Sequence, residues 1–280
     1  MDSYVERAPT RELARVVRTI WIHRTGDAPY VQRHLPTGGV EIYVPFGQPP
    51  RLSGPLTGPR LEVIPPHTTI VGARFLPAAA PPLPVLLDEL VDQHIDLSDL
   101  WGDIADQLGD MMAEAGGDER AVAALEGFLL REFRAAQTMD PRIREAVGAL
   151  MPWRPVDVAA VAAHVSLSES QLRRRSLQVV GLGPKVLQRT LRFQGFLALA
   201  QAGATPSGKR GADGIAGIAI DAGYADQAHL NRECLRLTGL TPSQLLHGDV
   251  DRCACGHDHA ASYLPFLATR ATAPRVQGRV

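Results

Sequence analysis

The sequence has few cysteines, with only three among its 280 residues. One of the three is unpaired by count, which argues against a scaffold held by disulfides and fits a reducing cytoplasm. No apolar run is long enough to span a membrane, and the first residues, Met-Asp-Ser-Tyr-Val-Glu, lack a signal-peptide pattern. We therefore expect a cytoplasmic protein with no membrane partner.

Local motifs of common enzymes are also missing from the chain. It contains no nucleophile elbow, no Gly-rich phosphate loop and no paired-carboxylate motif. Hydrophobic residues make up 45% and charged residues 21%, which is typical of an ordinary globular protein. The length is sufficient for two domains with separate cores. We therefore expect a two-domain protein that is not an enzyme.

The net charge of −1 would by itself argue against DNA binding, but the charge is unevenly distributed. Residues 1–156 hold 15 Lys/Arg and 21 Asp/Glu, a net charge of −6. Residues 157–247 hold 10 Lys/Arg and 6 Asp/Glu, a net charge of +4. The basic excess thus lies in the second half of the chain, where attraction to phosphates would need it.

One sequence pattern occurs twice between about Val156 and Gly248. The first copy runs from Val161 to Arg175 and is followed by Gly-Leu-Gly-Pro. The second runs from Ile218 to Arg232 and is followed by Gly-Leu-Thr-Pro. Each copy reads as a short apolar helix, a tight turn and a second helix with a polar cap. This outline predicts two helix-turn-helix units, each with a second helix that can enter the major groove of DNA.

Capping residues mark the start of each second helix. Ser168 and Gln171 have the spacing of a capping box, and Asp226 takes the capping position in the second copy. Gly223 lies where the chain must turn, and we predict a positive φ there. Leu172, Leu230 and Leu235 are predicted on inward faces. The remaining positions form the predicted DNA-reading surface: Ser170, Gln171, Arg173, Arg174, Gln227, Ala228, His229, Asn231 and Arg232.

The run Gly223-Tyr-Ala-Asp-Gln-Ala-His-Leu-Asn-Arg232, followed by Gly239-Leu-Thr-Pro242, resembles the second helix-turn-helix of the AraC/XylS family of transcriptional regulators. The resemblance covers roughly the last half of the chain, up to about Gly248. It implies binding to double-stranded DNA, with Arg174 and Arg232 approaching bases or nearby phosphates. Arginine suits this role because its planar fork can bind guanine O6 and N7 together.

Both copies depart from the family at one position. A phenylalanine usually follows two residues after the arginine of the reading helix, and here Ser176 and Cys234 stand there. Because those positions normally face the core in the family, the departure affects the expected packing more than the expected DNA contact.

The first half has short apolar runs separated by Pro and Gly. Val40–Phe46, Leu61–Ile64 and Thr68–Phe75 predict strands of a small antiparallel β-sandwich or barrel. Helical patterns follow, at Leu97–Met112, Glu119–Ala135 and Pro141–Leu150.

The segments Leu35-Pro-Thr-Gly-Gly-Val-Glu-Ile and Val71-Gly-Ala-Arg-Phe are similar to the N-terminal domain of a subgroup of AraC-like regulators, which is compared with cupin-like sensory folds. This resemblance implies a module that senses a small-molecule effector or forms a homodimer. Its four histidines, His23, His34, His67 and His94, are isolated in the sequence. We therefore predict that the domain binds no metal and that a mostly apolar cavity is its effector site.

Glu41 and Arg74 are charged residues inside strand-like runs of this half. Two interpretations remain open for them. They either point outward into solvent, or they bind an effector as a polar anchor.

The tail contains four metal-type side chains within seven residues: Cys253, Cys255, His257 and His259. Thiolates and imidazoles are preferred ligands of Zn²⁺ and Cu⁺, the only cofactors that the sequence suggests. A disordered hydrophilic tail and a redox-sensitive cysteine pair are the alternatives. Tyr263–Leu267 is a small apolar patch that can dock on another surface, and Ala268–Val280 are expected to be disordered.

We therefore predict an α+β protein. A cupin-like antiparallel β-barrel or sandwich with helices spans residues 1–134, and a linker helix with a proline-rich break spans 135–155. An all-α double helix-turn-helix domain spans 156–248, and the Cys/His tail spans 249–280. The predicted function is an effector-responsive regulator that reads adjacent major-groove segments. The alternatives are a metal- or redox-responsive regulator using the tail, a cupin-like enzyme with a degenerate DNA-binding domain, and an adaptor that has lost DNA binding.

Overall fold

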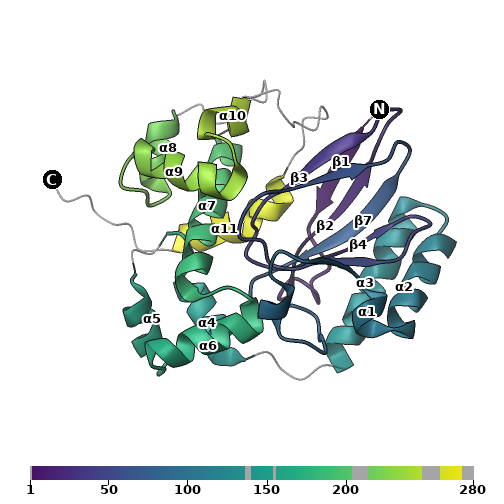
Figure 1. Ribbon diagram of the computed structural model, residues 1–280, viewed down its shortest axis with the longest axis horizontal. Coiled ribbons are helices and arrows are strands. Elements are labelled where there is room, and N and C mark those ends of the chain that lie inside the picture. The colour runs from purple at the N-terminus through teal and green to yellow at the C-terminus, as the bar shows by residue number, and fades with distance from the viewer. Residues whose placement is uncertain (1, 136–139, 154–155, 204–213, 248–258, 273–280) are drawn as a thin grey trace.

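An antiparallel six-stranded sheet forms the centre of the N-terminal half (Figure 1). The computed structural model describes residues 2–135, 140–153, 156–203, 214–247 and 259–272. The sheet has the strand order β1-β2-β7-β4-β5-β8, and a separate two-stranded ribbon pairs β3 with β6. The strands are β1 Ser3–Arg7, β2 Val17–Arg24, β3 Tyr30–His34, β4 Glu41–Pro45, β5 Arg51–Ser53, β6 Arg60–Ile64, β7 Thr69–Phe75 and β8 His94–Asp96.

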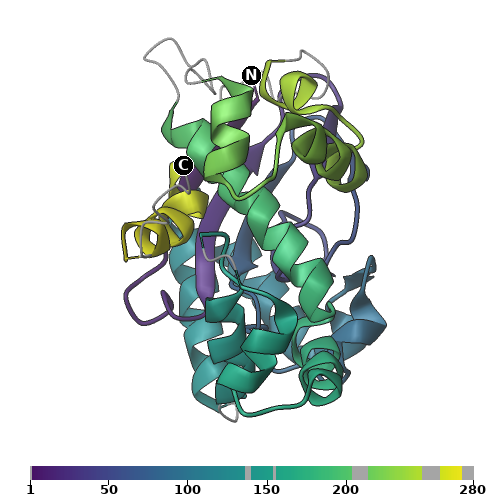
Figure 2. The same cartoon turned by 90° about the vertical axis from the view of Figure 1, so that its left-hand side faces the viewer.

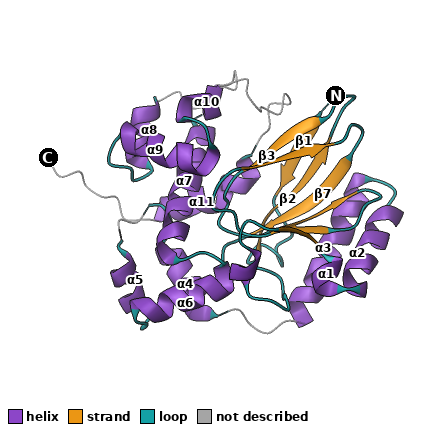
Figure 3. Ribbon diagram, viewed as in Figure 1, coloured by secondary structure: helices purple, strands orange, loops and turns teal. Residues whose placement is uncertain are grey.

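The two faces of the sheet have different coverings because side chains alternate along each strand. Val71 and Phe75 of β7 point to one face, where they share a core with Leu108 and Leu125. Those two leucines belong to α2 (Asp103–Glu114) and α3 (Asp118–Ala135), which follow the short α1 (Ser98–Trp101). Figure 3 shows these helices packed beside the orange strands.

Aromatic side chains fill the opposite face. Trp21, Tyr43 and Ile70 of the sheet pack with Tyr30 and Ile64 of the ribbon, and all five are buried. Trp21 lies so close to Gly72 that a Cβ at that position would overlap its indole ring. The rings thus occupy the space between the sheet and the ribbon. Because Gly72 has no side chain, the Trp21 indole can lie directly against the backbone of β7.

The C-terminal half is helical. Figure 2 shows the long α7 linking a lower group of helices, α4–α6, to an upper group, α8–α10, with α11 beside it. The helices are α4 Pro141–Ala149, α5 Val158–His164, α6 Glu169–Val180, α7 Pro184–Ala202, α8 Ile215–Asp221, α9 Gln227–Thr238, α10 Pro242–His247 and α11 Ala260–Thr272.

The structure confirms the predicted fold class, an antiparallel β domain followed by a helical domain. The predicted strands and the helices α3 and α4 are also present. The predicted helix Leu97–Met112 is broken at Gly102, whose φ of 52° and ψ of −132° separate α1 from α2. In the parts of the chain that the structure describes, no helix is both long and apolar enough to cross a membrane.

The prediction of disorder from Ala268 onward was wrong as far as Thr272. These residues belong to α11, which includes the predicted docking patch Tyr263–Leu267 and continues through Pro265. Phe266 is 1% exposed, so burial of this side chain holds the helix in place.

Candidate nucleic-acid interface

The helix α6 begins and ends where the sequence predicts. The Ser168 hydroxyl accepts from the Gln171 backbone amide (3.2 Å), and the Gln171 side chain accepts from the Ser168 amide (2.9 Å). This reciprocal pair is the predicted capping box. Gly181 ends the helix with a φ of 78°, a conformation that only glycine adopts cheaply.

The helix α9 repeats this arrangement. Asp226 caps it by accepting from the His229 amide at 2.6 Å, and Gly239 ends it with a φ of 73°. The turn before it contains Gly223 with a φ of 85°, which confirms the predicted positive φ. Both reading helices are therefore bounded by a polar N-cap and a left-handed glycine.

Seven of the nine predicted reading residues are exposed on these two helices, and His229 and Asn231 are half-buried. The Nδ1 atom of His229 accepts from the amide of Ala225 (3.4 Å), and its ring packs edge-on against Tyr224. His229 thus helps to shape the turn. The exposed residues are Ser170, Gln171, Arg173, Arg174, Gln227, Ala228 and Arg232.

Two further exposed residues were missed. Gln178 and Arg236 each lie four residues beyond a predicted reading arginine, Arg174 and Arg232. Residues four apart share one face of a helix, so this spacing was the signal that could have identified them.

The inward faces agree with the prediction at two of three leucines. Leu172 and Leu230 are buried, but Leu235 is 47% exposed. Leu235 lies five residues after Leu230, about 140° around the helix, so it leaves the inward face. Cys234 and Leu237 fill that face instead.

The two positions that depart from the family pattern remain part of the core. Ser176 is buried, and its hydroxyl donates to the Leu182 carbonyl at 2.6 Å, which satisfies the polar group. Cys234 is fully buried, and burial raises the pKa of its thiol to about 11, so it is an unreactive thiol. The small side chains are therefore accommodated without loss of either helix.

The helix α7 joins the two units rigidly. Twelve of its nineteen residues are buried. Leu187 shares a core with Leu172 of α6, and Phe196 shares a second core with Leu230 of α9. Nineteen helical residues span about 28 Å, so one continuous helix connects the two units.

Comparison with known families agrees with this geometry. A family model described as a helix-turn-helix domain matches residues 161–248, which include both repeats. Residues 161–248 are therefore a helix-turn-helix domain, in agreement with the resemblance to AraC-type regulators. A domain of this kind is typical of DNA-binding proteins that regulate transcription.

The N-terminal half and the whole chain give further comparisons. A family model described as a domain of unknown function (DUF6597) matches residues 5–96. No significant match was found among curated protein sequences. Among solved structures, the chain is similar to ToxT from Vibrio cholerae O395, with a TM-score of 0.39, 11% identity, and coverage of 88% of this chain and 96% of that one. Wild-type ToxT of strain SCE256 with bound unsaturated fatty acid gives a TM-score of 0.40, 11% identity, and coverage of 88% and 94%.

The C-terminal helix α11 connects the helix-turn-helix domain to the N-terminal sheet. Arg18 of β2 donates from Nε to the Ser262 carbonyl (2.6 Å) and from Nη2 to the Gln194 side chain on α7 (2.7 Å). Its guanidinium also lies 4.7 Å from the centre of the Phe266 ring. Burial lowers the pKa of Arg18 to about 10, so these contacts hold a buried cation at the junction.

Other contacts fasten α11 to the DNA-binding side. Trp153 donates from its indole to the Phe266 carbonyl at 2.7 Å. Arg270 forms an ion pair with Asp221 of α8 at 2.9 Å. The helix therefore lies between both halves of the protein and contacts each of them.

Glu41 and Arg74 point into this junction and away from bulk solvent. The interpretation that they point outward into solvent was therefore wrong. Arg74 pairs with Glu41 (2.6 Å) and Glu6 (3.1 Å), and it donates to the Ser262 hydroxyl (2.7 Å). Burial alone would raise the pKa of the Glu6 carboxyl. The pKa nevertheless stays well below its ordinary value, because His259 and Ser262 donate hydrogen bonds to Glu6 and the positive charge of Arg74 lies beside it. An effector role for Glu41 and Arg74 stays a prediction.

Three of the four predicted metal ligands, Cys253, Cys255 and His257, lie outside the described residues. The fourth, His259, contacts Glu6 through its Nδ1 atom at 3.0 Å. Within the described ranges, no three His, Cys, Asp or Glu side chains are arranged to hold a metal ion.

Two of the four N-terminal histidines are neighbours in space, although they are isolated in the sequence. His34 lies 2.9 Å from Glu62, and His94 hydrogen-bonds to Tyr43. The ring centres of His34 and His94 are 5.8 Å apart. Burial lowers the pKa of His94 to about 4. The cluster brings together strands β3, β6 and β8 with Tyr43 of β4.

Proposed function

We propose that the chain is a one-component transcription regulator. In this proposal α6 and α9 read two adjacent segments of the major groove, and the N-terminal domain responds to a small-molecule effector. Association of two copies through the N-terminal domain remains part of the proposal.

The observation that carries the DNA-reading proposal is the matched exposure of the two reading helices. Each begins with a satisfied polar cap, presents exposed polar and arginine side chains in its first two turns, and is joined to the other by the buried α7. The first turns of a reading helix are the part that reaches base edges in helix-turn-helix proteins. Arg174 and Arg232 occupy corresponding positions in the two copies, one for each groove segment.

An effector would have a direct route to the DNA-binding half. Glu41 and Arg74 lie beside α11, and Arg74 already contacts Ser262 of that helix. An effector that bound this charged pair would displace Glu6 or Ser262 from Arg74. Loss of that contact would loosen α11 from the sheet. The contact between Arg74 and Ser262, which helps to hold the two halves together, would then transmit effector binding to the DNA-binding half.

The test is DNA affinity of single variants of the full chain, with operator DNA first selected from genomic fragments. Arg232→Ala and Arg174→Ala are each expected to weaken binding to specific DNA by about 1–3 kcal/mol and to relax the preference at one base pair. Arg11→Ala removes an exposed arginine from the N-terminal domain and serves as the charge-matched control. Equal weakening on specific and random DNA would show that the arginines hold only phosphates. Full retention of binding in both variants would refute the proposed reading surface.

A further inference from the structure

The N-terminal domain touches both reading helices at the same place, the glycine that ends each of them. At α6, a Cβ on Gly181 would lie 2.8 Å from Cγ of Pro55. At α9, a Cβ on Gly239 would lie 3.8 Å from Cγ of Pro59. One short segment after β5, residues 54–59, therefore reaches the C-terminal ends of both helices, and we refer to it as the brace segment.

A second contact holds each of these ends. The Leu87 carbonyl oxygen, in the 3₁₀ helix η1 (Leu87–Leu90), would lie 2.7 Å from a Cβ on Gly181. Arg33 of β3 donates from Nη1 to the carbonyl of Thr238, the last residue of α9, at 2.8 Å. The end of an α-helix leaves such carbonyl groups without a partner inside the helix, and Arg33 supplies one. Each reading helix is therefore fixed at its end by two points of the N-terminal domain.

The brace segment is itself held firmly on the N-terminal domain. Gly54 packs so closely that a Cβ would overlap the Leu90 carbonyl oxygen. Thr57 donates to the Asp92 carboxylate from its amide (2.8 Å) and from its hydroxyl (2.6 Å). The Asp92 amide in turn donates to the Pro55 carbonyl at 3.0 Å. Because the rings of its two prolines also fix the backbone angle φ, the segment is rigid.

The length of the brace segment limits the distance between the two helix ends. Pro59 lies four positions after Pro55, and an extended chain advances at most about 3.3–3.6 Å per residue. The two contact points therefore lie no more than roughly 14 Å apart. The helix α7 already joins the two units through their cores. The brace segment adds a second connection at the helix ends, which closes a frame and restrains each reading helix relative to the other.

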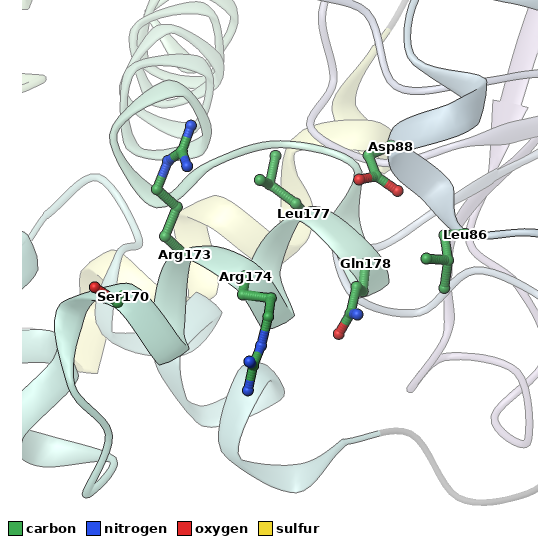
Figure 4. Close-up of a pocket in the computed structure, with 7 residues that line it drawn as sticks. All are labelled: Leu86, Asp88, Ser170, Arg173, Arg174, Leu177 and Gln178. Atoms are coloured by element: carbon green, nitrogen blue, oxygen red, sulfur yellow. The ribbon is translucent and has the colours of Figure 1, made fainter.

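The reading face of α6 stays open while the N-terminal domain contacts the helix end. Leu86 and Asp88 line one side of a groove of about 280 Å³, and α6 lines the other. Figure 4 shows Arg174 directed away from both of them. Ser170, Arg173 and Arg174 are all exposed. The brace segment can therefore remain in contact with both helices during DNA reading.

The separation and the angle between two reading helices decide which operators both of them can engage. One added base pair moves the second groove segment by about 3.4 Å along the DNA axis and turns it by roughly 34–36° around that axis. Two helices held in a rigid frame cannot follow this shift and this rotation together. One of them must then lose contacts with its bases.

We propose that the brace segment and Arg33 set the operator spacing that the protein accepts. They are positioning residues, which act through α6 and α9. This inference rests on the proposed DNA-reading function and adds a determinant of specificity that lies outside the helix-turn-helix repeat. The preferred DNA is a double-stranded operator whose two half-sites have one fixed separation.

The test compares operators that differ only in spacing. The full-length protein is titrated with its selected operator and with versions that carry one base pair more or one fewer between the two half-sites. The spacing penalty is the ratio of the Kd on the altered operator to the Kd on the selected operator. For the wild-type protein we expect a penalty of about tenfold or more, because one reading helix loses its base contacts.

Two variants loosen the frame. Arg33→Ala and, separately, Pro55→Gly with Pro59→Gly are each expected to lower the penalty to about threefold or less. Because the penalty is a ratio measured on one protein, a variant that merely folds less well leaves it unchanged. Arg33→Lys keeps a donor for the Thr238 carbonyl and is expected to restore the wild-type penalty. Arg11→Ala removes the same charge at an exposed site and is expected to keep the wild-type penalty.

A wild-type penalty in both the Arg33→Ala protein and the double proline variant would overturn the inference. So would a wild-type protein that distinguishes its operator from random DNA and yet tolerates the added base pair, and that result would leave DNA reading intact. A wild-type protein that binds its operator no more tightly than random DNA would refute the proposed function and, with it, this inference.

Discussion

The strongest structural prediction concerns Phe266, because α11 belongs to no part of the helix-turn-helix repeat and yet completes its core. The Phe266 side chain is 1% exposed and packs with Leu187 and Leu191 of α7. Truncating a buried phenylalanine to alanine costs about 3–5 kcal/mol. Loss of the Arg18 contact at 4.7 Å adds to this cost. Phe266→Ala is therefore expected to lower the free energy of unfolding by about 4 kcal/mol.

The matched control is Leu264→Ala on the same helix, where the side chain is 54% exposed. We expect that variant to change stability by less than about 0.5–1 kcal/mol. Urea unfolding followed by circular dichroism measures the free energy of unfolding of both variants. Trp153 fluorescence gives a local probe, because the Trp153 indole donates to the Phe266 carbonyl. If both variants unfold at the same urea concentration as wild type, α11 is not part of the core and this account of the junction is wrong.

Three further predictions concern backbone and charge. Gly181→Ala is expected to destabilise the chain by at least about 1–2 kcal/mol, because a φ of 78° is unfavourable for alanine and its Cβ would overlap the Leu87 carbonyl oxygen. The shift of the urea unfolding midpoint measures this loss. Gly127→Ala, within α3 and with no atom within 4 Å of its Cβ, is expected to stabilise by about 0.5–1 kcal/mol; a lower midpoint would contradict this. Burial lowers the pKa of His23 from 6.5 to about 4, so the unfolded chain binds more protons between these values. The contribution of neutral His23 to the free energy of unfolding is therefore fully present above pH 6.5, and it falls by up to roughly 3 kcal/mol toward pH 4. His23→Phe is expected to flatten that part of the profile of stability against pH.

Local signals predicted the helix boundaries of the DNA-binding half well. The Ser168 and Asp226 caps and the turn at Gly223 depend on residues within a few positions of each other, so they can be predicted from the sequence. The error at Leu235 has a simple cause. Leu230 and Leu235 are both predicted on the inward face of one helix, but the five-residue step between them carries Leu235 off that face.

The junction between the two halves could not have been predicted in the same way. Arg18 bonds to residues 244 and 176 positions away, and neither partner is distinctive in the sequence. The same holds for His34 and His94, which are isolated along the chain and come together only because the ribbon β3–β6 packs over the sheet. Glu41 and Arg74 are register partners on β4 and β7, so their pairing depends on strand order, which the sequence did not specify.

The central claim is that one chain reads two successive groove segments with two different helices. Hydroxyl-radical footprinting of the wild-type protein on its selected operator, repeated with Arg174→Ala and Arg232→Ala, tests it most directly. We expect two protected regions centred about 10 bp apart, with each substitution relaxing the preference within a different region. A single protected region, or both substitutions acting at the same base pair, would contradict it.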